Sequence, residues 1–341
     1  MAILGYKDIL QYSTGGASGI WASKTVSVVA GSDGLANASF PVDNVILPGF
    51  SKVFRRDNVT TGTVSLQIAL NAAITSSLVI HRFGAIGILG LRAIPATPIG
   101  GYDYELDVRV RDFAGYDQRR TYYGAESSGQ WPRQLWFSGF SGRTDNALAG
   151  AQGGTLSGEI LTLQIDITEN MATSTVYTLE IGRIVLMNCM TGRFEPTPTL
   201  GSSDTSQIVR SFSGVPYVLQ GTPSRQIAGR LIALPDEAIY GASKWEANGP
   251  ASGWGSTLDR VAREAGSKGE VVFIPEDYST TVASSGGRNY YPSAWQTRPV
   301  WGRLDDGVRA IRNTTTQATP APGTQVNALW DMEFSITESP L

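Results

Sequence analysis

The chain has 341 residues, more than one hydrophobic core usually serves, so its length predicts two domains. Charged residues make up 17% of the sequence, below the roughly 25% typical of soluble domains, and 39 residues are glycine. The formal net charge is −3 and no basic stripe is present, which excludes the usual kind of nucleic-acid-binding surface. So low a charge content favours a protein whose surface is largely covered by neighbouring molecules.

The first ten residues contain no basic region followed by an apolar run, so they do not resemble a signal peptide. No apolar stretch approaches the roughly 20 residues that span a bilayer. We therefore expect synthesis in a cytoplasm and no membrane insertion. A location outside the cell is then expected to come from lysis or from incorporation into a particle.

The residues that most often hold metals or perform catalysis are scarce. The single cysteine, Cys189, excludes an intrachain disulfide, and the single histidine, His81, excludes the common multi-histidine metal sites. Apolar neighbours favour a buried, inert Cys189 over a reactive thiol. His81 follows a short apolar segment, which favours the end of a strand over a catalytic base, since no G-x-S-x-G motif accompanies it. We predict no cofactor and no bound metal.

In the first half of the chain, short segments alternate apolar and polar residues with a period near two, which indicates β-strands. The expected strands lie at 2–6, 25–29, 64–70, 78–81, 86–93, 106–111, 134–137 and 161–168. Glycine, proline and serine recur between them as turn signals, and no long helical period interrupts the series. Residues 1–185 are therefore predicted to form a β-sandwich or jelly roll.

The second half has a mixed pattern. A proline-broken linker at 194–199 precedes two predicted helices, at 235–247 and 256–265. Pro235 suits the first helical turn of one, and Ser256 is an N-cap candidate for the other. Strands are expected at 270–274 and 327–337. Residues 186–341 are therefore predicted to form a β-rich α+β domain, and the chain as a whole to be mainly β.

Residues 38–93 contain a series of short motifs in a fixed order. An Asn/Asp-rich lead-in precedes Val-Phe-Arg-Arg at 53–56, a strand of the type xLxIxL follows at 66–70, and a short apolar strand ends in His-Arg at 78–82. A further strand ends in Leu-Arg at 91–92. This order resembles the galactose-binding-like jelly rolls that are appended to tail proteins of tailed bacteriophages.

The sequence departs from that family at Phe54, where tryptophan is usual, at Phe83 and Gly84, where polar residues are usual, and in lacking a calcium-type loop. In the second half, 179–183, 269–275 and 330–338 resemble the trailing scaffold of siphophage baseplate or minor tail proteins.

The resemblance implies a structural virion protein of the tail tip or baseplate, made in the host cytoplasm. It further implies a ring-like homo-oligomer, a trimer or hexamer, that contacts other tail proteins and aids attachment to the host surface.

Aromatic side chains cluster between residues 116 and 140, with arginines among them. Aromatic rings beside polar groups can stack on sugars, which makes Tyr122, Tyr123, Trp131 and Trp136 candidates for binding host-surface glycans. The alternative is that these rings pack in the core or at subunit contacts, where Trp, Tyr and Arg are frequent. A carbohydrate-binding module is thus the second functional hypothesis.

Carboxylates at Asp103, Glu105 and Asp107 alternate along a predicted strand, which favours the solvated face of that strand. Their spacing matches neither an EF-hand calcium loop nor a glycosidase motif. We therefore predict no catalytic residues and no enzymatic activity. A polysaccharide depolymerase is the enzymatic alternative, and it would require two close carboxylates in a cleft.

Overall fold

The computed structural model describes residues 2–8, 10, 21–47, 52–60, 62–72, 83–95, 103–112, 117–125, 134–138, 160–169, 176–194, 199–203, 207–210, 216–219, 224–234, 269–274, 284–285, 288–291, 299–313 and 329–339. The chain divides into two compact units. The N-terminal unit comprises Asp8–Asn188 and Tyr278–Arg298, and the C-terminal unit comprises Met1–Lys7, Cys189–Asp277 and Pro299–Pro340. The main division thus lies between Asn188 and Cys189, and each unit also takes a segment from the other half of the sequence.

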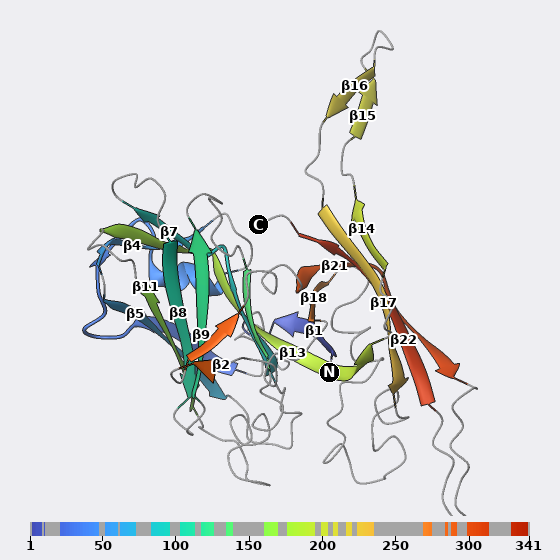
Figure 1. Ribbon diagram of the computed structural model, residues 1–341, viewed down its shortest axis with the longest axis horizontal. Coiled ribbons are helices and arrows are strands. Elements are labelled where there is room, and N and C mark those ends of the chain that lie inside the picture. Colours follow the sequence, from blue (N-terminus) through green and yellow to red (C-terminus); the bar gives the residue numbers. More distant parts are fainter. Residues whose placement is uncertain are drawn as a thin grey trace, which may run out of the picture. The chain divides into compact units, whose positions relative to one another are not determined.

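The N-terminal unit contains a seven-stranded sheet (Figure 1). Its strands follow the order β19 (Ser284–Ser285), β20 (Arg288–Tyr291), β9 (Asp117–Ala125), β8 (Asp103–Asp112), β11 (Ile160–Glu169), β5 (Thr63–Ala72) and β2 (Trp21–Val28). All neighbours are antiparallel except β20 and β9, which are parallel. The alternating pattern is confirmed where side chains are described, because Val64, Leu66 and Ile68 of β5 and Leu163, Ile165 and Ile167 of β11 are buried.

A four-stranded antiparallel sheet in the same unit has the order β3 (Leu35–Ala36), β4 (Phe54–Val59), β12 (Tyr177–Ile181) and β7 (Arg92–Pro95). The chain passes between the two sheets from β2 to β3, from β4 to β5 and from β11 to β12, as in sandwich folds. A 3-10 helix, η2 (Val42–Ile46), contacts both β2 and β4. In addition, β10 (Gln134–Ser138), β6 (Phe83–Leu89) and β13 (Arg183–Phe194) pair antiparallel.

The predicted mainly β fold is confirmed. The described residues contain no α-helix, but both predicted helices, at 235–247 and 256–265, and the predicted strand at 78–81 lie outside them.

The single strand predicted at 86–93 is wrong. It is two strands, β6 and β7, in different sheets. Gly90 lies between them with φ +66°, a conformation that side chains other than glycine rarely adopt. A Cβ atom there would also lie 3.3 Å from the backbone of Gly182. The apolar run continues through the turn, so hydropathy alone gives no sign of the break.

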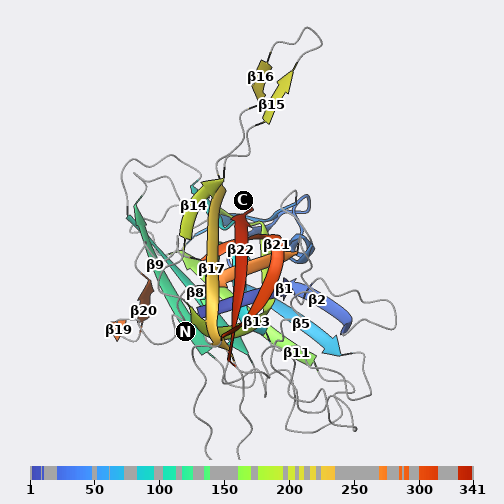
Figure 2. The same cartoon turned by 90° about the vertical axis from the view of Figure 1, so that its right-hand side faces the viewer.

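The C-terminal unit contains six strands in the order β1 (Ala2–Asp8), β18 (Glu270–Ile274), β21 (Val300–Asn313), β22 (Leu329–Glu338), β17 (Ser224–Leu234) and β14 (Thr199–Ser203). Figure 2 shows β21, β22, β17 and β14 side by side. A separate two-stranded sheet pairs β15 (Gln207–Arg210) with β16 (Pro216–Leu219).

The core of the C-terminal unit is one apolar cluster. It contains Leu4 from β1 and Ile227 from β17, which come from distant strands of the sheet order, together with side chains of β18, β21 and β22. Within it the rings of Phe273 and Phe334 lie 5.0 Å apart. The cluster thus joins side chains of five consecutive strands of the sheet order.

A buried ion pair lies in the N-terminal unit. Arg183 Nη2 donates to Asp8 Oδ2 at 2.8 Å, and both side chains are almost completely enclosed. Asp8 Oδ1 also accepts the backbone N–H groups of Leu186 and Leu10, each at 3.1 Å. Burial raises the pKa of Asp8, while Arg183 and these two N–H groups oppose that rise.

Replacing Asp8 with asparagine would leave the Arg183 charge buried without its counter-charge. We expect Asp8→Asn to lower the free energy of unfolding by about 3–5 kcal/mol, the usual cost of removing one partner from a buried pair. Urea denaturation measures this loss. The same substitution at exposed Asp306 is the control and should change the unfolding midpoint little. Equal effects at both positions would contradict a structural role for the pair.

Candidate functional site

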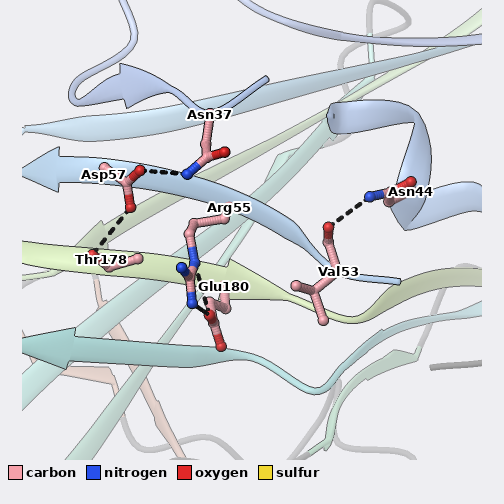
Figure 3. A network of polar contacts seen from close by, with 7 residues as sticks. All are labelled: Asn37, Asn44, Val53, Arg55, Asp57, Thr178 and Glu180. Atoms are coloured by element: carbon pink, nitrogen blue, oxygen red, sulfur yellow. Dashed lines mark hydrogen bonds and ion pairs between the residues drawn. The ribbon is translucent and has the colours of Figure 1, made fainter. Parts of the chain in front are cut away.

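The outward face of the four-stranded sheet carries a cluster of polar side chains. In β12, Tyr177, Leu179 and Ile181 are buried, so the alternating residues Thr178 and Glu180 lie on the opposite face. Figure 3 shows these two beside Arg55 and Asp57 of β4. We call this surface the polar face.

Arg55 is held in place by two neighbours. Its Nε donates to Glu180 Oε1 at 2.9 Å, and its Nη2 donates to the same oxygen. The guanidinium carbon also lies 4.7 Å from the centroid of the Phe40 ring, a cation–π contact. Arg55 keeps 32% of its side chain exposed, whereas the Glu180 side chain keeps 10% and the residue is buried, so Arg55 is the more accessible member of the pair.

A second set of bonds orients Asp57. Asn37 Nδ2 donates to Asp57 Oδ2 at 2.7 Å, and Thr178 Oγ1 donates to Asp57 Oδ1 at 3.3 Å (Figure 3). Nearby, Asn44 Nδ2 donates to the carbonyl of Val53 at 2.7 Å and thereby ties η2 to the start of β4. Each carboxylate oxygen can accept more than one hydrogen bond, so the carboxylate retains acceptor capacity for a ligand.

Strand register arranges the polar face in two rows. In the first row, Leu35 pairs with Asp57, and Ile94 pairs with Thr178, which bonds to Asp57. In the second row, Arg55 and Arg92 pair with Glu180 from either side. Leu35 and Ile94 are 61% and 42% exposed. The first row crosses three interstrand spacings, about 14 Å, with an apolar side chain at each end.

Asp33 fixes the loops that hold β3 against β4. Its Oδ1 accepts the N–H of Gly34 at 2.7 Å, and its Oδ2 accepts the N–H and Oγ1 of Thr60, at 2.7 and 2.9 Å, and the N–H of Gly62 at 3.0 Å. Arg56 donates to the carbonyls of Ser32 and Asp33. Partial burial raises the pKa of Asp33, but the hydrogen bonds from Thr60, Gly34 and Gly62 outweigh it, so the pKa lies below 3.8.

The aromatic residues predicted to bind sugars are not brought together in the described structure. Tyr122 and Tyr123 belong to β9, but their side chains, like the whole of Trp131, lie outside the described residues. Trp136 lies in β10 with 3% exposure, and its Nε1 donates to Gln134 Oε1 at 3.0 Å. Its ring fills the space above Gly87, where a Cβ atom would lie 2.6 Å away. So enclosed a ring offers no face to a sugar, and its placement favours the packing alternative.

Two other sequence expectations concern single polar residues. Asp107 is 3% exposed, so its predicted place on a solvated face is wrong. The next residue, Val108, is also buried, and since successive strand residues point to opposite faces, both faces of β8 are covered at this point. Cys189 lies in β13, and its side chain is outside the described residues, as is His81.

Sequence analysis singled out Arg55 only within a family motif and did not identify its partners. Glu180 lies 125 residues away, and Thr178 lies 121 residues from Asp57, so only strand pairing reveals the polar face. Across the described parts of the chain, no group of three or more His, Cys, Asp or Glu residues could hold a metal ion. The same parts contain no helix that is both long and apolar enough to cross a membrane.

No protein-family model matches this chain, and no curated protein matches it. Among solved structures, the carbohydrate-binding module TmCBM61, in complex with β-1,4-galactotriose, is similar at 10% identity over 53% of this chain and 99% of the module, with a TM-score of 0.23. An exo-β-agarase is similar at 11% identity over 47% of this chain and 25% of the enzyme, with a TM-score of 0.16. Likenesses this low carry no weight for the fold or the ligand.

The lowered pKa of Asp33 predicts a specific acid sensitivity. Its ionised form stabilises the fold at pH values above about 4, and this contribution is lost as the pH falls through the lowered pKa. We expect Asp33→Asn to be less stable than the native protein at about pH 7 and to lose less further stability on acidification to about pH 3. Urea midpoints at both pH values measure the effect, with Asp306→Asn as the control. Parallel acid dependence in Asp33→Asn and the native protein would contradict it.

Proposed function

We propose that this protein is a non-enzymatic structural component of the tail tip or baseplate of a tailed bacteriophage, and that it attaches to surface glycans through the polar face. The attachment is supported by one observation above all, the row of oriented polar side chains between exposed Leu35 and Ile94, with the row of Arg55, Glu180 and Arg92 beside it. The tail setting is supported by the sequence resemblance and the low charge content. A free-standing carbohydrate-binding module would use the same face.

The composition of the polar face suits a sugar. Sugar hydroxyls both donate and accept hydrogen bonds, and the face offers the carboxylates of Asp57 and Glu180 beside the guanidinium of Arg55. Exposed Arg92 pairs with Glu180 in strand register on the other side. A sugar ring also has apolar C–H faces, which can pack on Leu35 or Ile94. The opposite charges balance, so the face favours a neutral ligand over a strongly charged one.

The side chains are oriented before any ligand arrives. Arg55 is fixed by Glu180 and Phe40, and Asp57 is fixed by Asn37 and Thr178. Ordering a long side chain on binding costs about 0.5–1.5 kcal/mol, so a preformed arrangement avoids part of that cost. Because water competes for every sugar hydroxyl, we still expect weak binding by a single site.

We expect the native protein to bind neutral host-surface oligosaccharides on a glycan array, and Ile94→Asn to weaken that binding at least about tenfold, equivalent to about 1.4 kcal/mol. Titration calorimetry with the best oligosaccharide measures the change. Ile311→Asn is a matched control, because Ile311 is 41% exposed against 42% for Ile94 and lies in the C-terminal unit.

Two outcomes would contradict glycan binding at the polar face. One is a native protein that binds no host glycan. The other is loss of binding in Trp131→Ala with unchanged binding in Ile94→Asn, which would assign the sugar to the aromatic segment 116–140. Recovery of the oligosaccharide uncleaved after incubation separates binding from depolymerase activity.

The structural role predicts where the protein is found. We expect purified phage particles to contain it in the tail fraction, in a copy number that is a multiple of three. Quantitative mass spectrometry of particles, and immunogold labelling of the tail, measure this. A protein present in the infected cell but absent from washed particles would contradict the role.

A further inference from the structure

Strand β14 lies at a sheet edge among the described strands. It ends the strand order of the C-terminal unit, and none of the described strands pairs with the side that faces away from β17. Thr199, Gly201 and Ser202 are exposed, and a Cβ atom on Gly201 would meet nothing within 4 Å. Such an edge presents backbone N–H and C=O groups to another strand.

The outer strands of the larger described sheets, β14 apart, have features that natural proteins use against edge pairing, and β15 of the two-stranded sheet carries Arg210. The edge strands β3 and β19 have only two residues each. β7 ends on Pro95 and exposes Arg92, and β2 carries Lys24. β10 is buried from Gln134 to Phe137. By contrast, β14, with the sequence TLGSS, has no charge, no proline and no cover among the described residues.

The neighbouring strand pair has almost the same register as β14 and β17. Ser203 pairs with Ser224, and Gln207 pairs with Leu219. Ser203 and Gln207 lie four residues apart along the chain, whereas Leu219 and Ser224 lie five apart, so the register shifts by one residue between the two strand pairs. On the β16 side, Pro216 lacks a backbone N–H and blocks edge pairing, whereas β15 contains no proline.

We propose that β14 pairs antiparallel with β14 of a second copy of this chain, across a two-fold axis near Gly201. With the axis at Gly201, Thr199 of one copy lies opposite Ser203 of the other. Because β14 contains no charged residue, no like charges meet across the pair. A two-fold axis satisfies both edges at once and leaves neither open, whereas a different partner would need its own unprotected strand. The absence of a side chain on Gly201 lets the two backbones approach closely.

This inference deepens the proposed structural role and rests on it in one respect, that the protein associates with itself. A two-fold contact gives a dimer or, with a second interface, a hexamer of D3 symmetry. The sequence resemblance implies a trimer or a hexamer. Since a trimer has no two-fold axis, the two-fold β14 contact favours the hexamer.

The test uses the full chain with one edge variant and one matched control. Gly201→Lys adds the charge by which natural edges avoid pairing, in a position with open space. We expect it to halve the mass measured by sedimentation equilibrium, or to raise the dissociation constant at least about a hundredfold. Ala38→Lys adds the same charge at an exposed position outside any strand and should leave the mass unchanged.

Gly201→Cys tests the pairing directly. Residues directly opposite in an antiparallel pair have Cα atoms about 4.5–5.5 Å apart, within the range that a disulfide bridges. We expect mild oxidation to give a covalent dimer that reducing agent dissolves, while the native protein, with Cys189 alone, gives the background.

The outcomes separate the two proposals. An oligomer that survives Gly201→Lys and gives no crosslink in Gly201→Cys would overturn the β14 contact and leave the structural role standing. A native protein that stays monomeric at all concentrations, alone and in particles, would overturn both.

Discussion

Backbone hydrogen bonding is the constraint on which this protein depends. A strand interior to a sheet pairs its N–H and C=O groups on both sides, and a strand at an edge leaves one side to solvent or to a partner. With no α-helix among the described residues, nearly every described segment meets this constraint by strand pairing. The features of each edge strand therefore decide whether that strand can pair with a strand of another molecule. Short strands, Pro95 and burial close most edges, and β14 is the exception.

The same pairing creates the polar face. Register sets which side chains meet across strands, and alternation sets which of them leave the core. The ion pair between Arg55 and Glu180 is partly exposed, and pairs of that kind contribute only about 0–1 kcal/mol to stability. Its main physical effect is to fix the direction of the guanidinium. The buried pair of Asp8 and Arg183 differs, because neither charge has water as an alternative partner.

Alternation predicted much of the fold. Segments 64–70, 106–111 and 161–168 lie within β5, β8 and β11, because one face of each strand packs in the core. It did not reveal β21, where an irregularity between Leu304 and Val308 shifts the apolar period, with Gly307 at φ +82°. The polar face was beyond local patterns, since its key contacts join residues more than 100 positions apart. Trp136 is the opposite case, because the sequence suggested it as a sugar contact and its side chain is buried. Composition alone does not distinguish an aromatic ring in the core from one that binds a ligand.

The two proposed surfaces reinforce each other physically although they belong to different units. The polar face lies in the N-terminal unit, and β14 lies in the C-terminal unit, so neither surface uses residues of the other. A single polar face is expected to bind a sugar weakly, because water competes for every hydroxyl. The proposed pairing of β14 with its copy would place two such faces on one particle. Linked sites bind a repeating glycan far more tightly than either alone, provided that the spacing lets both engage. Under these two proposals, attachment would depend on the β14 edge as well as on the polar face, which would give a physical reason for leaving β14 without a charge or a proline.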